Sequence, residues 1–457
     1  MTKIRHYLSL AAIVIAAPLF AQETVATAAT TDSGSAKPAA TPAEPTRSMM
    51  VQSIEIQRLR PVDQRGVNVF EAPKTDNVAY QGFKLAWGAA FTQQFQGLDH
   101  KNSSTKPLVR IGHGFNNANA NLYMNAQLAP GIRVALTSYL SARHHQETWV
   151  KDGYLLIDES PLKLLPLQFI MAYTTVKAGH FEINYGDAHF RRTDNGHSLY
   201  NPFVGNLILD AFTTEIGGEV YLRASGLMLM GGITGGEVRG AVRSPEKRSP
   251  AFLGKAGFDR QITPDLRVRL TGSAFTQKHS MNNTLYTGDR AGSRYYSVMD
   301  TVGSTETAQA WSGNIQPGFG DKVSARVINP FVKFRGAELF ANIETAKGRA
   351  GTEVNDRKWT QNSVEGLYRF AADEQLYVGA RYNVAKGQLP NVRVGGAGTA
   401  LADLTIDRYQ ASAGWFITPG VLLKAEYMTQ TYDGFPVADP RSGGKFKGFV
   451  VEGVVAF

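Results

Sequence analysis

The sequence predicts an all-β fold, an antiparallel β-barrel that spans a membrane, and three observations predict it. Segments of about 10 to 13 residues alternate apolar and polar side chains along most of the chain, which is typical of barrel strands. Short turns and long polar loops follow one another between these segments. The chain ends on one more alternating segment, which closes with Phe457.

The composition excludes several other classes of protein. The 457 residues contain no Cys, which excludes disulfide frameworks, Cys-ligated metal sites and thiol nucleophiles. Beyond the N-terminus no apolar run reaches about 18 residues, so the sequence does not describe a multi-span helical membrane protein. The formal net charge of +9 comes without a run of Lys and Arg, and we therefore expect no nucleic-acid partner.

The N-terminal region predicts export. Lys3 and Arg5 precede a short apolar stretch and a small-residue cleavage site, so residues 1–21 are expected to be a cleaved signal peptide. Residues 22–50 are rich in Ala, Thr, Pro and Ser and predict a flexible periplasmic leader. Residues 51–81 carry scattered apolar side chains in a polar setting, and both a periplasmic arm and a short strand remain open for them.

The remaining chain, 82–457, repeats one amphipathic hairpin. In 118–128 every second residue is apolar, a Pro-Gly turn follows, and 132–143 repeats the alternation. The same reading predicts strands near 82–96, 118–128, 132–143, 147–157, 173–182, 211–223, 227–237, 251–261, 266–277, 325–335, 337–347, 359–370, 375–386, 405–417, 421–432 and 446–457.

These segments predict a barrel of about 16 strands. Counts of 14 and 18 remain open because the alternation is weak at 147–182 and 251–261, and because 278–324 is long enough to hold a further hairpin. An even count places both termini at the end with the short turns. In a membrane barrel that end is periplasmic and the long loops are extracellular.

The last strand carries the most specific signal. Phe449, Val451, Val455 and Phe457 lie on one face, and Glu452 lies on the other. A terminal Phe in such a strand resembles the C-terminal signature of bacterial outer-membrane barrels, which the barrel assembly machinery reads. The resemblance implies a location in the outer membrane of a Gram-negative bacterium, with outer-membrane lipids around the barrel.

A second resemblance concerns the type of barrel. The span Val176 to Gly186, followed by Asn201-Pro202-Phe203, resembles the phosphate-selective porin O and P family. In that family a comparable strand end leads into a loop that folds into the pore. The resemblance implies a porin architecture and a homotrimer. His180 stands where that family tends to have Arg or Lys, so phosphate selectivity is not carried over.

The polar faces of the strands are expected to line the lumen. Cations outnumber acids on these faces, and a cationic wall favours anions. The alternative is that inward Arg and Glu residues brace the wall against each other. The candidate pore-wall residues are Arg133, Arg143, Arg223, Arg267, Arg269, Arg381, Arg408, Lys424, Glu215 and Glu219.

A barrel of this size needs an inserted loop to be selective. Loop 183–210 combines a dense group of charges of both signs with apolar residues that could anchor it inside, and loop 278–324 is the alternative. A solvated extracellular tip is the competing interpretation for either loop. The candidate constriction residues are His189, Arg191, Arg192, Asp194 and His197.

The sequence thus favours an outer-membrane porin for passive diffusion of small hydrophilic solutes, with a mild preference for anions. A substrate-specific channel for phosphate or another anion is the alternative, and a barrel that carries an enzyme or adhesin is a third hypothesis. No arrangement of residues predicts a catalytic site, a cofactor or a metal site, so we expect a protein that is not an enzyme.

Overall fold

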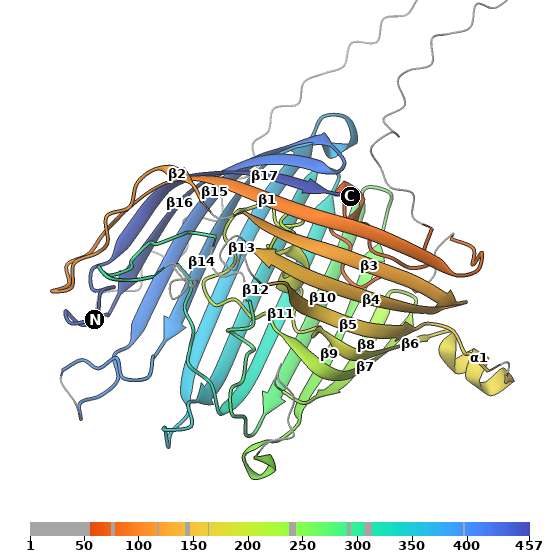
Figure 1. Cartoon of the computed structure of the whole chain (residues 1–457), viewed down its shortest axis with the longest axis horizontal. Helices are drawn as coiled ribbons and strands as arrows, with labels where there is room; N and C mark the ends of the chain where they lie inside the picture. The colour runs from red at the N-terminus through yellow and green to blue at the C-terminus, as the bar shows by residue number, and fades with distance from the viewer. Residues whose placement is uncertain are drawn as a thin grey trace, which may run out of the picture. The chain divides into compact units, whose positions relative to one another are not determined.

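The chain forms one closed antiparallel sheet. The computed structural model describes residues 55–74, 78–116, 118–141, 147–162, 164–236, 244–289, 294–305, 313–395 and 398–457, which belong to the compact unit Arg47–Phe457. Figure 1 shows the strands of this unit side by side. They are β1 (Lys84–Lys101), β2 (Gly114–Phe115), β3 (Asn119–Ala129), β4 (Ile132–Ser141), β5 (Trp149–Ile157), β6 (Thr174–Glu182), β7 (Thr214–Ala224), β8 (Leu227–Thr234), β9 (Ala251–Gln261), β10 (Leu266–Gln277), β11 (Lys322–Phe334), β12 (Ala337–Arg349), β13 (Arg357–Phe370), β14 (Leu376–Gly387), β15 (Leu404–Thr418), β16 (Val421–Asp433) and β17 (Lys445–Ala456).

The ends of the sheet meet at β1. This strand pairs with β17 from Ala90 opposite Ala456 onward, and with β3 from Lys84 opposite Gln127 onward. Closure leaves no unpaired sheet edge among the described strands. Among the described residues the sheet has 17 strands, and β2 has only two residues, so the predicted sixteen long strands are confirmed. The described parts of 278–324 contain no further hairpin before β11 begins at Lys322.

Side chains alternate between the two faces of the sheet, as period-two strands require. On β17 the carboxylate of Glu452 is fully buried inside, whereas Phe449 and Val455 are 42% and 40% exposed outside. The outer face of the other strands is likewise apolar, with exposed side chains that include Trp87, Leu229, Leu339 and Tyr427. The inward face is polar and buried, so the predicted strand register is confirmed.

The two ends of the barrel differ. Short turns join β3 to β4, β7 to β8, β11 to β12 and β15 to β16, and we call this the short-turn end. The connection between β5 and β6 at this end holds helix α1 (Leu165–Met171), which begins with a Pro in its first turn and has no buried residue (Figure 1). Longer segments join the strands at the other end, which we call the long-loop end.

The described part of the chain contains no helix that is both long and apolar enough to cross a membrane.

Three segments fill the inside of the barrel. They are residues 55–74, here called the arm; residues 183–213, here called the inserted loop; and the described parts of 278–321, here called the long loop. The arm contains a single 3-10 turn (Gln64–Gly66), capped by the carboxylate of Asp63, and its described residues include no strand. The side chain of Phe70 holds the arm against the inner wall, 5.4 Å from the ring of Phe331.

Candidate functional site

The inserted loop is bound to the wall through its own backbone. The amide of Ile208 donates to the side-chain oxygen of Asn383 at 2.7 Å. The side-chain oxygen of Gln361 accepts from the backbone N–H of Leu209, and the side-chain nitrogen of Gln361 donates to the backbone carbonyl of Leu209, each at 2.7 Å. A buried loop needs partners for its peptide groups, and β13 and β14 supply them. The polar inward face therefore holds the loop in place.

Three of the predicted pore-wall cations also bind the backbone of the inserted segments. The ammonium of Lys424 donates to the carbonyls of Ser198, Asn201 and Phe203, each at 2.9 Å, and pairs with Glu452 at 2.8 Å. The guanidinium of Arg381 donates to the carbonyl of Gly205 at 2.9 Å, and that of Arg408 to the carbonyl of Gly313 in the long loop at 2.7 Å. These three cations of the barrel wall therefore hold the inserted loop and the long loop in place.

The two predicted constriction arginines each face two carboxylates. Arg191 pairs with Glu365 on β13 at 2.8 Å and with Glu338 on β12 at 3.5 Å. Arg192 pairs at 2.6 Å with Asp210 of the inserted loop and at 2.6 Å with Asp289 of the long loop. Both guanidinium groups are buried and neutralised, so the structure shows them as loop anchors. The sequence analysis placed both arginines at the constriction of the pore, where they would face acids across it.

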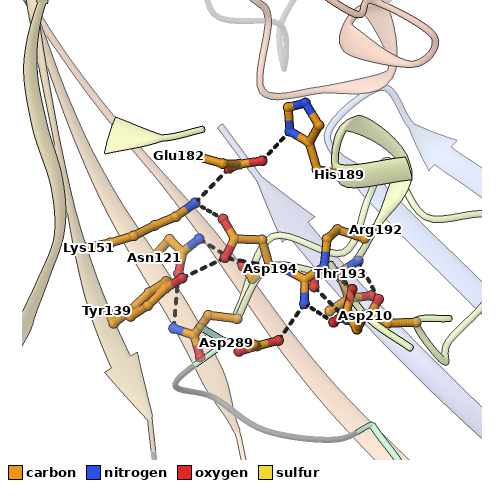
Figure 2. A network of polar contacts seen from close by, with 12 residues as sticks. Asn121, Tyr139, Lys151, Glu182, His189, Arg192, Thr193, Asp194, Asp210 and Asp289 are labelled. Atoms are coloured by element: carbon orange, nitrogen blue, oxygen red, sulfur yellow. Dashed lines mark hydrogen bonds and ion pairs between the residues drawn. The ribbon is translucent and has the colours of Figure 1, made fainter. Parts of the chain in front are cut away.

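Two other constriction candidates, His189 and Asp194, belong to a polar network that includes Lys151 of β5 (Figure 2). Lys151 pairs with Asp194 and, at 3.5 Å, with Glu182, whose carboxylate also binds His189. The hydroxyl of Tyr139 donates to Asp194 at 2.7 Å. The structure therefore brings together Asp194 and His189 through two charged residues that the sequence analysis did not select.

His197 lies beside this network. Burial, reinforced by the nearby charges of Arg60 and Lys151, lowers the pKa of its imidazole to about 3. Its ring is therefore neutral at neutral pH and packs edge-on against Tyr200, with the ring centroids 4.2 Å apart. His197 thus acts as a packing residue in this conformation.

Gly196 brings the tip of the inserted loop into contact with the wall. A Cβ at this position would lie 2.4 Å from the Cα of Ala120 on β3 and 2.6 Å from the carbonyl oxygen of Ala90 on β1. The neighbouring Asn195 donates its side-chain amide to the side-chain oxygen of Asn121 at 2.9 Å. Only glycine allows this close approach.

The arm is held by a second set of buried charges. Glu71 pairs with Lys255 on β9 at 3.0 Å and with Arg269 on β10 at 2.8 Å. Both cations also pair with Asp187 of the inserted loop, at 2.7 and 2.8 Å. Asn68 of the arm donates to Glu338 at 2.6 Å. The arm and the inserted loop therefore share their anchoring sites on the wall.

A cavity of about 300 Å³ lies between the arm, the inserted loop and strands β3 to β7. We call it the lumen cavity. Its lining combines charged groups with aromatic rings, including Tyr123, Tyr154, Phe190 and Tyr200. Among the described residues, its charged lining consists of Arg60, Arg133, Lys151, Lys177, Arg192, Arg223, Glu71, Asp152, Glu182 and Asp194.

A second cavity, of about 1060 Å³, lies at the short-turn end, and we call it the vestibule. Its lining includes the turns after β9, β11, β13 and β15 together with arm residues 64, 65, 67 and 68. Arm residues 59, 60, 62 and 70 to 72 line the lumen cavity instead. The arm therefore contributes to both spaces.

The remaining pore-wall candidates that the structure describes also point inward. Arg133 pairs with Asp158 at 3.4 Å. Arg267 and Arg269 both pair with Asp259, at 2.6 and 3.1 Å. Glu215 and Glu219 are fully buried, and Arg223 lines the lumen cavity. Arg143 lies outside the described residues, as do the predicted signal peptide and leader.

The sequence analysis missed the arm residues that line the lumen cavity, above all Arg60 and Glu71. The only signal was a set of apolar residues, including Val67 and Phe70, whose spacing fits neither a strand nor a helix. Such a segment packs through irregular contacts that periodicity does not reveal.

Comparisons with known proteins give a likeness among solved structures only. No family model and no curated protein matches the chain. In vitro folded OmpT, an outer membrane protein of Vibrio cholerae, is 12% identical over 83% of this chain and 99% of its own, with a TM-score of 0.47. An anion-selective porin from Comamonas acidovorans is 10% identical over 82% of this chain and 100% of its own, with a TM-score of 0.48. The outer membrane channel DcaP of Acinetobacter baumannii is 9% identical over 82% of this chain and 98% of its own, with a TM-score of 0.47. All three TM-scores lie below 0.5, so we draw the function from this chain's own residues.

Proposed function

We propose that this protein is an outer-membrane channel for small hydrophilic solutes. The observation that carries the proposal is the inversion of polarity across the barrel wall. The outside is apolar, with Trp87 and Leu339 more than half exposed, while inward carboxylates such as Glu452 and Glu215 are fully buried. Exposed apolar surface on this scale needs a lipid environment, and a polar interior suits water-soluble cargo.

In this proposal the short-turn end faces the periplasm, and the signal peptide of residues 1–21 directs export. Trp87, Tyr427, Phe449 and Phe457 are exposed on the outer face, where aromatic residues mark the borders of a bilayer. The barrel assembly machinery would read the strand that ends in Phe457. A homotrimer and membership of the phosphate-selective porin O and P family belong to the proposal as well.

The inserted loop and the arm determine what passes. They reduce the lumen to spaces lined by charged and aromatic groups, which favours a selective channel over a wide diffusion pore. In the lumen cavity six cationic side chains face four carboxylates among the described residues, and in the vestibule five face three. This excess supports the preference for anions, while most individual charges brace the loops.

The alternative of an enzyme or adhesin on a barrel receives less support. His197 is buried, neutral and packed against Tyr200. Nucleophilic catalysis requires a base with a partner that orients it beside a nucleophile. The ring of His189 binds the side chains of Glu182 and Asn184, and among the described residues no Ser or Thr hydroxyl forms a hydrogen bond with it.

Liposome swelling tests the proposal. Proteoliposomes should swell in isosmotic solutions of small sugars and amino acids, at rates that fall steeply with solute size, because the inserted segments narrow the lumen. Liposomes with the same protein denatured by heat before reconstitution provide the control. Equal, negligible swelling in both preparations would reject the channel function.

A further inference from the structure

Strand β5 directs two consecutive charged residues into the lumen. On β4, Thr137 pairs with Asp152 and Ser138 pairs with Val150, so Lys151 is an extra residue in a β-bulge. Bulges redirect side chains and are frequent beside functional sites. A regular strand would send either Lys151 or Asp152 outward, yet both are buried, at 5% and 6% exposure.

The two residues differ in their partners. Lys151 pairs with Asp194 and Glu182. Asp152 lines the lumen cavity, and one of its carboxylate oxygens is fully buried without a hydrogen-bond partner. Within the described residues no cation lies within ion-pair distance of Asp152. A buried carboxylate without a partner is costly, so this position points to a cationic group that comes from outside the chain.

The same cavity also presents a cation without a carboxylate partner. Arg60 donates to the carbonyl of Gly66 at 3.0 Å and to that of Phe190 at 3.0 Å, and its guanidinium lies 3.6 Å from the ring centroid of Tyr200. These contacts fix the guanidinium but do not neutralise it. Among the described residues no carboxylate forms an ion pair with Arg60.

The two unpaired charges share one cavity with an aromatic side chain. Asp152 and Arg60 line the lumen cavity together with Tyr123. The cavity volume of about 300 Å³ is at the lower end of the range for ligand pockets, about 300 to 1,000 Å³. The rings of Tyr123 and Tyr200 offer apolar surface and a face for a cation. The cavity is thus complementary to a small solute that carries both charges.

We propose that the lumen cavity binds a zwitterionic solute of the α-amino-acid type, with its ammonium group at Asp152 and its carboxylate at Arg60. This inference rests on the proposed channel function and names its class of solute. The cost of holding Asp152 and Arg60 unpaired is then offset whenever the solute is bound.

Solute-induced interruptions of the ion current through single channels in planar bilayers test the proposal. The probes are L-phenylalanine, 3-phenylpropanoate, which lacks the ammonium group, and 2-phenylethylamine, which lacks the carboxylate. L-phenylalanine should interrupt the current about tenfold longer than either analogue, because each analogue lacks one charged hydrogen bond to the site, and tenfold corresponds to about 1.4 kcal/mol. Asp152→Asn should shorten the interruptions by L-phenylalanine about tenfold and leave those by 3-phenylpropanoate unchanged. Arg60→Gln should also shorten the interruptions by L-phenylalanine about tenfold and leave the interruptions by 2-phenylethylamine unchanged.

A solvent-accessible ion pair at the long-loop end provides matched controls. Lys322 and Asp356 lie 2.7 Å apart and line neither the lumen cavity nor the vestibule, so Asp356→Asn and Lys322→Gln should leave all interruptions unchanged. Interruptions of equal length by L-phenylalanine and by one analogue would overturn the proposal in favour of a site for a single charge. Normal conductance without interruptions by any probe would also overturn it, whereas the absence of conductance would refute the channel function itself.

Discussion

Replacing Glu71 by Gln should release the arm from the lumen. The carboxylate of Glu71 accepts from Asn184 at 3.0 Å and pairs with Lys255 and Arg269, at 3.0 and 2.8 Å. Among the described residues, both cations share one other carboxylate, that of Asp187. Glutamine keeps the shape of the side chain but leaves two buried cations with one shared carboxylate.

The expected effect is large. Removing one partner from a buried ion pair costs about 3 to 5 kcal/mol. Asp187 remains, and Arg269 also retains Asp259 at 3.1 Å, so we expect the lower end, about 3 kcal/mol. That value corresponds to an increase of about 100-fold in the fraction of molecules with an undocked arm.

Limited proteolysis by trypsin measures this fraction. Arg58 is buried in the docked arm and pairs with Glu159 at 2.7 Å, so cleavage after Arg58 requires undocking. The cleavage rate follows the open population when opening and closing are fast. Mass spectrometry of the folded protein in detergent should show cleavage after Arg58 about 100-fold faster in Glu71→Gln.

Glu55→Gln is the matched control. Glu55 belongs to the same arm and pairs with Lys84 at 3.0 Å, but both side chains are solvent-accessible. Exposed pairs contribute about 0 to 1 kcal/mol, so this variant should change the cleavage rate by less than about fivefold. If Glu71→Gln is cleaved at the wild-type rate, the buried ion pairs do not hold the arm.

Four further predictions follow from individual residues. Burial raises the pKa of Glu71, but Lys255 and Arg269 outweigh burial and hold this pKa well below its ordinary value of 4.5. The stabilisation of the docked arm is therefore complete above the unfolded-state pKa of Glu71 and is lost as pH falls through its folded-state pKa. Cleavage of the arm by an acid-stable protease should be constant between about pH 7 and 5 and increase only below about 4.5. Asp152→Asn should raise the thermal unfolding midpoint, because it removes a buried charge without a partner; a lower midpoint would show that Asp152 is compensated within the chain. Arg335→Glu adds a negative charge to the exposed wall of the vestibule, and the reversal potential in a salt gradient should move toward cations; an unchanged potential would place selectivity elsewhere. Deletion of Phe457 removes its two backbone hydrogen bonds to Ala89, at 2.9 and 3.0 Å, and should leave little heat-modifiable barrel in the outer membrane; a normal yield would contradict a role in assembly.

The sequence predicts the barrel well because the inside and the outside of a wall impose a period of two on every strand. All sixteen long strands lie where the alternation indicated, and their ends differ from the predicted bounds by a few residues. The weak alternation at 147–182 has two physical causes. One is the bulge that turns Lys151 and Asp152 inward together, and the other is helix α1, which replaces a short turn.

The contents of the lumen could be predicted only in part. The structure places loop 183–210 inside the barrel, as its apolar anchors suggested, and buries Phe203, Ile208 and Leu209 there. The partners of Arg191 could not be predicted, because Glu338 and Glu365 lie on strands far away in the sequence. A pairing of this kind depends on three-dimensional register, which residue types do not encode locally.

The single-channel conductance of the purified protein before and after removal of the arm tests the central claim most directly. The account predicts small, discrete current steps for the full chain. It predicts clearly larger steps for a variant that lacks residues 55–74, because the arm lies inside the barrel and lines both the lumen cavity and the vestibule, while the closed sheet of β1 to β17 remains. Equal steps in both proteins would show that the arm does not restrict the lumen, and the absence of steps in both would contradict the channel function.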